Sequence, residues 1–296
     1  MFPVLFSIGS LSVSSFGIFL ALGFLLGLFL IWRLTRAWDL DEEKVLDLIL
    51  IIFVGGMIFA RVFFALENLP YFTSSPLNLI KFSKVPGFSF WGGFLGGWLT
   101  LYIFAKRKRF DFWQLADIAF VGLLGGLILA QVGCFLGGCN VGAPSKFFFA
   151  VNMAGFVGKR WPVQVIEVIF LSISLLKIWS QATHFHQRGK IAGMGLILVG
   201  VIKLVLEPLK QNHSEVIFPL LFVLLGVVIL YKVTRKSPIV QLKGLMTFLG
   251  DFFTDAKARK KVVQNLGKCW YNQKTSFGWK LRNLKKLLRR SNVKFS

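Results

Sequence analysis

The hydrophobic residues of this chain gather into seven long stretches, separated by shorter polar segments. A helix needs roughly 17–25 residues to cross the hydrocarbon core of a bilayer. The seven stretches lie at residues 11–32, 45–66, 88–105, 113–138, 162–178, 190–208 and 216–232. The pattern predicts an all-α integral membrane protein with seven transmembrane helices.

Basic residues are unevenly shared among the connections between these stretches. The first, third and fifth connections hold Arg33, Arg36 and Lys44, then residues 106–109, then Lys177, Arg188 and Lys190, whereas residues 1–10 hold no Lys or Arg. Cytoplasmic loops of membrane proteins are enriched in Lys and Arg. We therefore expect the N-terminus outside and the C-terminus in the cytoplasm, as an odd number of spans requires.

Composition separates the chain into two parts. Of 296 residues, 55% are hydrophobic, yet the formal net charge is +22. From Lys232 onward, 17 Lys and Arg face only Asp251 and Asp255. We predict a transmembrane domain at residues 1–235 and a basic cytoplasmic tail at 236–296. The tail is either an amphipathic helix on an anionic membrane surface or a disordered segment that fixes topology.

The long apolar stretches exclude a soluble nucleic-acid-binding protein, despite the positive charge. Three cysteines are too few for a small disulfide-rich scaffold. Cys134 and Cys139, five residues apart on a helix, would be too distant for a disulfide unless the helix has already broken, so we expect two buried small residues. The sequence Gly137–Pro144 indicates that a helix breaks near the outer surface.

A few polar groups lie within the predicted spans, where each ionisable residue costs about 2.5–3.5 kcal/mol and usually faces a cavity or a partner. Lys203 is one of them, and those in the outer halves of their spans are Arg61, Gln131, Gln164, Glu167 and Glu207. They predict a cavity, open to the outer leaflet, for an amphiphile with an anionic headgroup. Buried salt bridges that tie helices together are an equally good interpretation.

Other titratable groups are assigned to structure rather than chemistry. Asp117 lies near the predicted cytoplasmic end of the fourth span, where we expect a cap or a structural group. His184, His186 and His213 all fall in connections. The spans therefore hold no histidine that would serve as a general base.

Four segments carry a resemblance to a known family. They are Phe90-Trp91-Gly92-Gly93, the run Gln131 to Gly138, Arg160-Trp161-Pro162-Val163-Gln164 with Glu167, and Lys203 to Lys210. In order and spacing they resemble the Phe-His-Gly-Gly, Arg-hydrophobic-Gly-Asn/Cys-Phe-x-x-Gly, Arg-His-Pro-Ser-Gln-x-x-Glu and Arg-x-x-x-Glu-x-x-Arg motifs of the prolipoprotein diacylglyceryl transferases. Residues 60–64, around Arg61, resemble that family's second span.

The resemblance implies an enzyme of the bacterial cytoplasmic membrane without a cofactor or metal. It would move a diacylglyceryl group from phosphatidylglycerol to the lipobox cysteine of a preprolipoprotein signal peptide, with no nucleic acid involved. By the same resemblance, Gln131, Glu167 and Glu207 would be catalytic, and Arg61, Arg160 and Lys203 would bind the lipid phosphate. The cavity would be lined by Trp91, Gly92, Gly93, Cys134, Gly138, Asn140 and Gln164.

Several positions depart from the family pattern. Gln131 replaces the central Arg, Trp91 the third-span His, Cys139 an acidic residue and Lys203 an Arg. Two functions follow: a transferase with altered chemistry, or a degenerate paralogue that binds phospholipid or lipoprotein without transfer. A small-solute transporter is disfavoured, because no two corresponding broken helices mark repeated halves.

Overall fold

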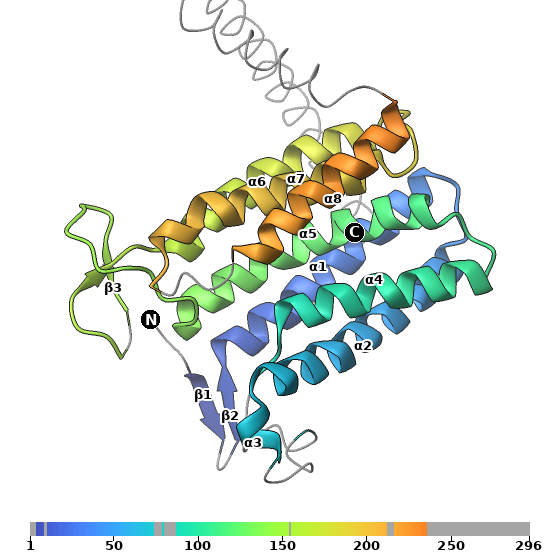
Figure 1. Ribbon diagram of the computed structural model, residues 1–296. Coiled ribbons are helices and arrows are strands. Elements are labelled where there is room, and N and C mark those ends of the chain that lie inside the picture. The colour runs from blue at the N-terminus through green and yellow to red at the C-terminus, as the bar shows by residue number, and fades with distance from the viewer. Residues whose placement is uncertain are drawn as a thin grey trace, which may run out of the picture. The chain divides into compact units, whose positions relative to one another are not determined.

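The residues that the structure describes include seven long helices (Figure 1). The computed structural model describes residues 4–8, 11–73, 79, 87–153, 155–211 and 216–235. The long helices are α1 (Ser15–Ala37), α2 (Glu42–Glu67), α4 (Phe90–Arg107), α5 (Phe112–Gly137), α6 (Val163–Ala182), α7 (Lys190–Leu206) and α8 (Ile217–Thr234). The shorter elements are α3 (Leu69–Thr73), the 3-10 helix η2 (Glu207–Leu209), and strands β1 (Val4–Ile8), β2 (Leu11–Ser14), β3 (Val151–Asn152) and β4 (Lys159–Arg160).

Each predicted hydrophobic stretch overlaps one of these long helices. Six of them are long and apolar enough to cross a membrane, namely α1, α2, α5, α6, α7 with η2, and α8. Helix α4 is not among the six: four glycines and the terminal Lys106 and Arg107 lower its mean hydropathy. The chain is therefore all-α apart from two small β-ribbons, with six candidate spans among the described residues.

The first helix begins later than its hydrophobic stretch. Residues Leu11–Ser14 pair with Val4–Ile8 as an antiparallel ribbon, so the apolar residues at 11–13 belong to β2. The Ser14 hydroxyl then accepts a hydrogen bond from the amide of Gly17 at 3.1 Å. Such a side-chain cap satisfies an amide that lacks an intrahelical partner, which sets the start of α1 at Ser15.

Aspartates fix the starts of two other helices. The Asp41 carboxylate accepts the amide of Lys44 at 3.2 Å and begins α2. Asp111 accepts the amides of Trp113 and Gln114 at 2.9 and 3.2 Å and begins α5. The two aspartates follow tight turns between consecutive helices, so α1 and α2, like α4 and α5, run antiparallel (Figure 1).

Glycine lets paired helices approach closely. Helix α1 packs along α5, α2 along α4, and α7 along α8. A Cβ atom on Gly27 of α1 would lie only 2.8 Å from the carbonyl oxygen of Gly122 on α5. On α4, a Cβ on Gly92 would collide with Phe63 of α2, and one on Gly93 would lie 3.3 Å from Ala60 Cβ. Small residues at such seams permit tight packing of membrane helices.

The connection between α5 and α6 is tied to the end of α7. The amide of Ala143 donates to the carbonyl of Leu209 at 2.8 Å, and the amide of Gln211 donates to Val141 at 3.0 Å. The amide of Trp161 in turn donates to Ala143 at 3.1 Å. Three segments distant in sequence are thus joined at one end of the bundle. The predicted tail, residues 236–296, lies outside the described residues.

Candidate functional site

A buried ion pair joins α6 and α7 near this end. Lys203 Nζ lies 3.0 Å from Glu167 Oε1, and both side chains are less than a tenth exposed. The Lys203 ammonium also lies 4.9 Å from the ring centroid of Phe90, the first residue of α4. A buried charge requires a partner of this kind. The structure therefore pairs Lys203 with Glu167 of another helix rather than with Glu207 of its own sequence motif.

A second buried pair follows at once in the chain. Lys210 Nζ lies 2.7 Å from Glu207 Oε2, and both residues are buried. Helix α7 ends at Leu206, and Glu207 opens η2 with Pro208 directly after it. Because η2 departs from the α-helix, Lys203 and Glu207 belong to different elements. Both ion pairs nevertheless lie at the same end of the bundle, because η2 directly follows the last turn of α7.

The expectation for the two cysteines was wrong. Cys134 and Cys139 form a disulfide, with Cα atoms 5.0 Å apart. Helix α5 ends at Gly137, and Gly138 adopts a left-handed conformation with φ of 80°. That turn folds the chain back, so that the amide of Cys139 donates to the carbonyl of Cys134 at 3.0 Å. An unbroken helix would have kept the sulfurs apart, whereas the glycine cap brings them together.

Gln164 connects this turn to α6. It is fully buried, and its side-chain amide donates to the carbonyls of Cys139 and Asn140, the latter at 3.0 Å. Asn140 itself has a positive φ of 55°, as the turn requires. Gln164 Oε1 has no hydrogen-bond partner within the described part of the chain.

Arg160 lies at the base of the same connection, in β4. Its guanidinium donates to the carbonyl of Gly142 at 3.2 Å and to Gln211 Oε1 at 3.0 Å, and it lies 4.5 Å from the ring centroid of Phe156. Arg160 is 8% exposed. Arg160 therefore links the connection after α5 to Gln211, which follows the end of α7.

Gln131 lies on a small cavity between α5 and α6. The cavity has a volume of about 110 Å³ and is otherwise lined by Val132, Phe135, Val165 and Val168. Gln131 is 7% exposed, and its Oε1 has no hydrogen-bond partner among the described residues. An unpaired buried carbonyl costs about 1–3 kcal/mol. The Oε1 atom is covered by protein, and the part of Gln131 that lines the cavity is apolar.

Trp91 packs among aromatic rings. Its ring stacks on Phe218 of α8 at 4.8 Å between centroids and meets Phe222 edge-on at 5.1 Å. Trp91 is 4% exposed, and its indole nitrogen finds no hydrogen-bond partner in the described ranges. The residue that stands in the place of the family's histidine therefore joins α4 to α8.

Arg61 is held by the connection between α2 and α4. It donates to the carbonyls of Leu79 at 3.0 Å and Gly87 at 2.9 Å, and its guanidinium lies within 6 Å of the rings of Phe64 and Phe72. Arg61 is buried. These bonds place it with α2 and α4, whereas Glu167, Lys203 and Gln164 belong to α6 and α7.

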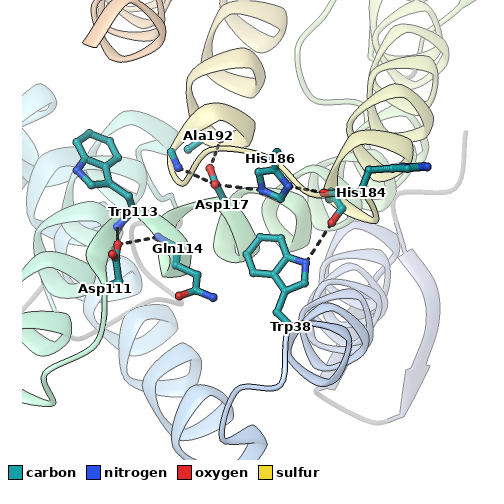
Figure 2. Close-up of polar contacts among 10 residues, drawn as sticks. Trp38, Asp111, Trp113, Gln114, Asp117, His184, His186 and Ala192 are labelled. Carbon is teal, nitrogen blue, oxygen red and sulfur yellow. Dashed lines mark hydrogen bonds and ion pairs between the residues drawn. The ribbon is translucent and has the colours of Figure 1, made fainter. Parts of the chain in front are cut away.

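A separate polar cluster lies at the opposite end of α5 (Figure 2). Asp117 is fully buried and accepts the amides of Gly189 and Ala192, both at 2.7 Å, so it caps α7 from another helix. The assignment of Asp117 as a cap or structural group is confirmed. Its Oδ2 also lies 3.5 Å from His186 Nε2, and the His186 ring lies 5.0 Å from that of Trp38.

The hydrogen bond with Asp117 raises the pKa of His186, although partial burial acts in the opposite direction. Nearby, partial burial raises the pKa of Asp111, but the hydrogen bonds from Arg188 and from the amide of Gln114 outweigh it and lower that pKa. Sequence reasoning did not find the Asp117–His186 contact, because the two residues belong to α5 and the α6–α7 connection and share no motif.

Comparison with known proteins identifies the family. The sequence profile of the prolipoprotein diacylglyceryl transferases matches residues 3–241. The chain belongs to this family. A phosphatidylglycerol–prolipoprotein diacylglyceryl transferase of Thermoanaerobacter sp. (strain X514) is 31% identical over 176 residues, which are 59% of this chain and 65% of the relative. The chain thus matches just under two thirds of the length of that relative.

Other relatives with the same printed name match over a longer range. The protein of Clostridium tetani is 23% identical over 218 residues, 72% of this chain and 86% of the relative. The protein of Rickettsia rickettsii is 26% identical over 224 residues, which are 73% of this chain and 86% of the relative. This diacylglyceryl transferase family member is accordingly a multi-pass membrane protein with bacterial relatives and six candidate spans.

Proposed function

We propose that this chain transfers a diacylglyceryl group from phosphatidylglycerol to the thiol of a lipobox cysteine in a preprolipoprotein. The thiol sulfur attacks the glycerol carbon that carries the phosphate, the carbon–oxygen bond breaks, and a thioether forms as glycerol phosphate leaves. The thiol proton must move to a base, and the departing phosphate needs a cation. The observation that carries the proposal is the buried Lys203–Glu167 pair, which supplies both groups 3.0 Å apart.

The pairing couples the two requirements. While Glu167 is ionised, its charge compensates that of Lys203. When Glu167 accepts the thiol proton, the Lys203 ammonium loses that partner and its field acts on the leaving phosphate. Such electrostatic interactions are strong in a site that excludes water. Arg160 and Arg61 add positive charge, and Glu207 holds Lys210 by the bond described above.

Gln131 is proposed to hold the lipid headgroup in place of the family's arginine. In this proposal the amide nitrogen of Gln131 donates to a phosphate oxygen of the phosphatidylglycerol headgroup. The wall of Val132, Phe135, Val165 and Val168 suits acyl chains. Trp91, Gly92, Gly93, Cys134, Gly138, Asn140 and Gln164 complete the surroundings of the site in this proposal.

A second function is favoured by one observation. Gln131 carries no charge where the family has arginine, so a charge-assisted contact to the leaving phosphate is lost at this position. This agrees with a paralogue that binds phospholipid or lipoprotein and transfers nothing. The two functions can be distinguished by one product, the diacylglyceryl-modified peptide, which only the transferase forms.

The proposal includes a membrane arrangement. We infer seven spans, with α4 as the seventh, the N-terminus outside and the C-terminus in the cytoplasm of a bacterium. The support is that α4 packs along α2 and ends in Lys106 and Arg107, beside Lys108 and Arg109. These basic residues favour the cytoplasmic side. The site then lies toward the outer leaflet.

The test is a transfer assay with the full-length protein in phosphatidylglycerol liposomes and a lipobox peptide. The expected product is the peptide with the added mass of one diacylglyceryl group. Glu167→Gln should lower the rate by about 10²–10⁴-fold, the usual contribution of a general base. Glu43→Gln, an exposed carboxylate in the first turn of α2, is the control and should leave the rate unchanged. Lipid binding without any product would assign the non-transferring function.

Restoring the family's arginine probes Gln131. Because a charge-assisted contact to the leaving phosphate is worth about 10²–10³ in rate, Gln131→Arg should raise transfer by a large part of that factor. Gln131→Met, which keeps the size but removes the amide, should lower it. Equal rates for the three proteins would show that position 131 does not contact the lipid headgroup during transfer.

A further inference from the structure

The connection between α5 and α6 exposes an unusual set of large apolar side chains. Phe148 is 82% exposed, Val157 98%, and Phe147 and Phe149 at least half exposed. Phe156 is also exposed. We call residues 145–149 and 155–159 the aromatic loop. Apolar groups gathered on one projecting segment mark an interaction surface rather than ordinary surface scatter.

The rings of Phe147, Phe148 and Phe149 form one surface. The rings of Phe148 and Phe149 lie 4.0 Å apart between centroids, and that of Phe147 lies 5.3 Å from Phe149. Phe147 also stacks on Trp161 at 5.1 Å, directly before α6. The rings contact one another and the base of the loop, yet their outer faces remain uncovered.

The loop is held in place by the site. The amide of Ser145 donates to the carbonyl of Lys159 at 2.9 Å, which closes the base of the loop. Arg160, buried against Gly142 and Gln211, contacts Phe156 at 4.5 Å. The exposed rings are therefore displayed by a structured segment that begins just after α5 and ends just before α6 (Figure 1).

The positive charge of the aromatic loop favours an anionic partner. Lys146 and Lys159 are exposed and flank the apolar side chains, and residues 139–162 contain no Asp or Glu. Exposed aromatic residues beside lysines match the interface of an anionic bilayer, where rings enter the headgroup layer and lysines meet lipid phosphates. That interface lies next to the loop, because α5 and α6 are candidate membrane spans.

We propose that the aromatic loop inserts Phe147, Phe148, Phe149 and Val157 into the anionic headgroup layer of the membrane that the helices cross. Lys146 and Lys159 contact lipid phosphates at its rim. The inserted loop holds the outer end of the site, through Arg160, against the surface from which a lipid enters. Membrane contact of the loop does not require that the chain catalyse transfer.

The experiment places an environment-sensitive fluorophore on the loop of the full-length protein. Phe148→Cys, in a Cys269→Ser background, gives one reactive thiol because Cys134 and Cys139 are joined in a disulfide. In liposomes containing phosphatidylglycerol, the emission should shift to the blue and be quenched by lipids that carry a nitroxide near the headgroup. Unshifted, unquenched emission would overturn the proposal. A blue shift without lipid quenching would place the loop against protein and would also overturn it.

Charge variants test the anionic surface. A basic residue near an anionic leaflet contributes about 1 kcal/mol, so neutralising two should weaken insertion by roughly 10–30-fold. Lys146→Gln with Lys159→Gln should therefore lower the lipid quenching. The matched control is Lys106→Gln with Lys108→Gln, two exposed lysines at the other end of the bundle, which should leave it unchanged. Quenching that is the same in neutral and anionic liposomes would refute the role of the lysines.

Discussion

Lys203 and Glu167 show why residue-level contacts decide the chemistry of this protein. Each is nearly removed from water, and each compensates the charge of the other at 3.0 Å. A buried pair adds little to stability compared with a well-packed apolar pair, but loss of one partner leaves an uncompensated charge. Both facts can be measured on the folded protein without an activity assay.

We predict that Lys203→Met lowers the free energy of unfolding by about 3–5 kcal/mol, because Glu167 is left buried and unpaired. Glu167→Leu should cost a similar amount, and the double variant should recover most of the loss. Thermal unfolding of the purified protein in detergent measures this. Arg188→Gln, which removes the exposed pair with Asp111 at 2.7 Å, is the control and should cost less than about 1 kcal/mol. Additive losses in the double variant would show that the two residues act separately.

The charged residues of the site could be identified from the sequence, whereas the partner of each charged side chain could not. Glu167 and Lys203 stood out because charge within a span is costly. Their contact depends on how α6 lies against α7, which no spacing encodes. The disulfide was missed because it requires the positive φ of Gly138, a turn that ends α5 two residues before Cys139.

At the scale of elements, Asp117 joins α5 to the start of α7. A carboxylate near amides at a helix start is stabilised by the helix dipole and by direct hydrogen bonds. His186 lies beside that carboxylate and contacts Trp38 at the end of α1. The protonation of one side chain in a connection therefore affects how three helices are held.

We predict that the stability of the protein falls as pH rises above neutrality. The hydrogen bond with Asp117 raises the folded-state pKa of His186 above its unfolded value of about 6.5, although burial opposes it. The stabilisation is then fully present below about pH 6.5 and is lost as pH rises through the folded pKa. Melting temperatures between pH 5.5 and 8.5 should show this decline, and His186→Gln should remove it.

His184→Gln serves as the matched control for that prediction. His184 is exposed in the same connection and bonds the Ser180 carbonyl rather than a carboxylate. Its substitution should leave the pH dependence of the melting temperature unchanged. The same slope in His186→Gln and in the unsubstituted protein would assign the decline to other groups.

Elements were more predictable than contacts. Every hydrophobic stretch overlaps a long helix, because a helix satisfies the backbone groups of a span within the segment itself. The departures have local causes: β2 takes the first residues of the first stretch, and η2 ends α7 before Glu207 and Pro208. The close seam of Gly27 on Gly122 follows from the packing of two helices, and hydropathy alone does not specify that pairing.

At the scale of the whole molecule, the number of spans depends on α4. Its hydropathy is the lowest of the long helices because of its glycines and its terminal Lys106 and Arg107, yet those glycines are the means by which it packs along α2. A helix in a bundle can be less apolar than an isolated span, because protein covers part of its surface. If the two ends of α4 lie on opposite sides of the membrane, the number of spans is odd. If they lie on the same side, it is even.

We predict that Tyr71 and Lys108, which bracket α4, lie on opposite sides of the membrane. Tyr71 is 63% exposed in α3, and Lys108 follows the last residue of α4. In intact bacterial cells, a membrane-impermeant maleimide should label Tyr71→Cys but label Lys108→Cys only after the cells are opened. Both substitutions are made with Cys269→Ser, and Asn152→Cys in β3 should behave like Tyr71→Cys. Labelling of Tyr71→Cys and Lys108→Cys from the same side would show that α4 does not span the bilayer. It would also place the two ends of the chain on one side.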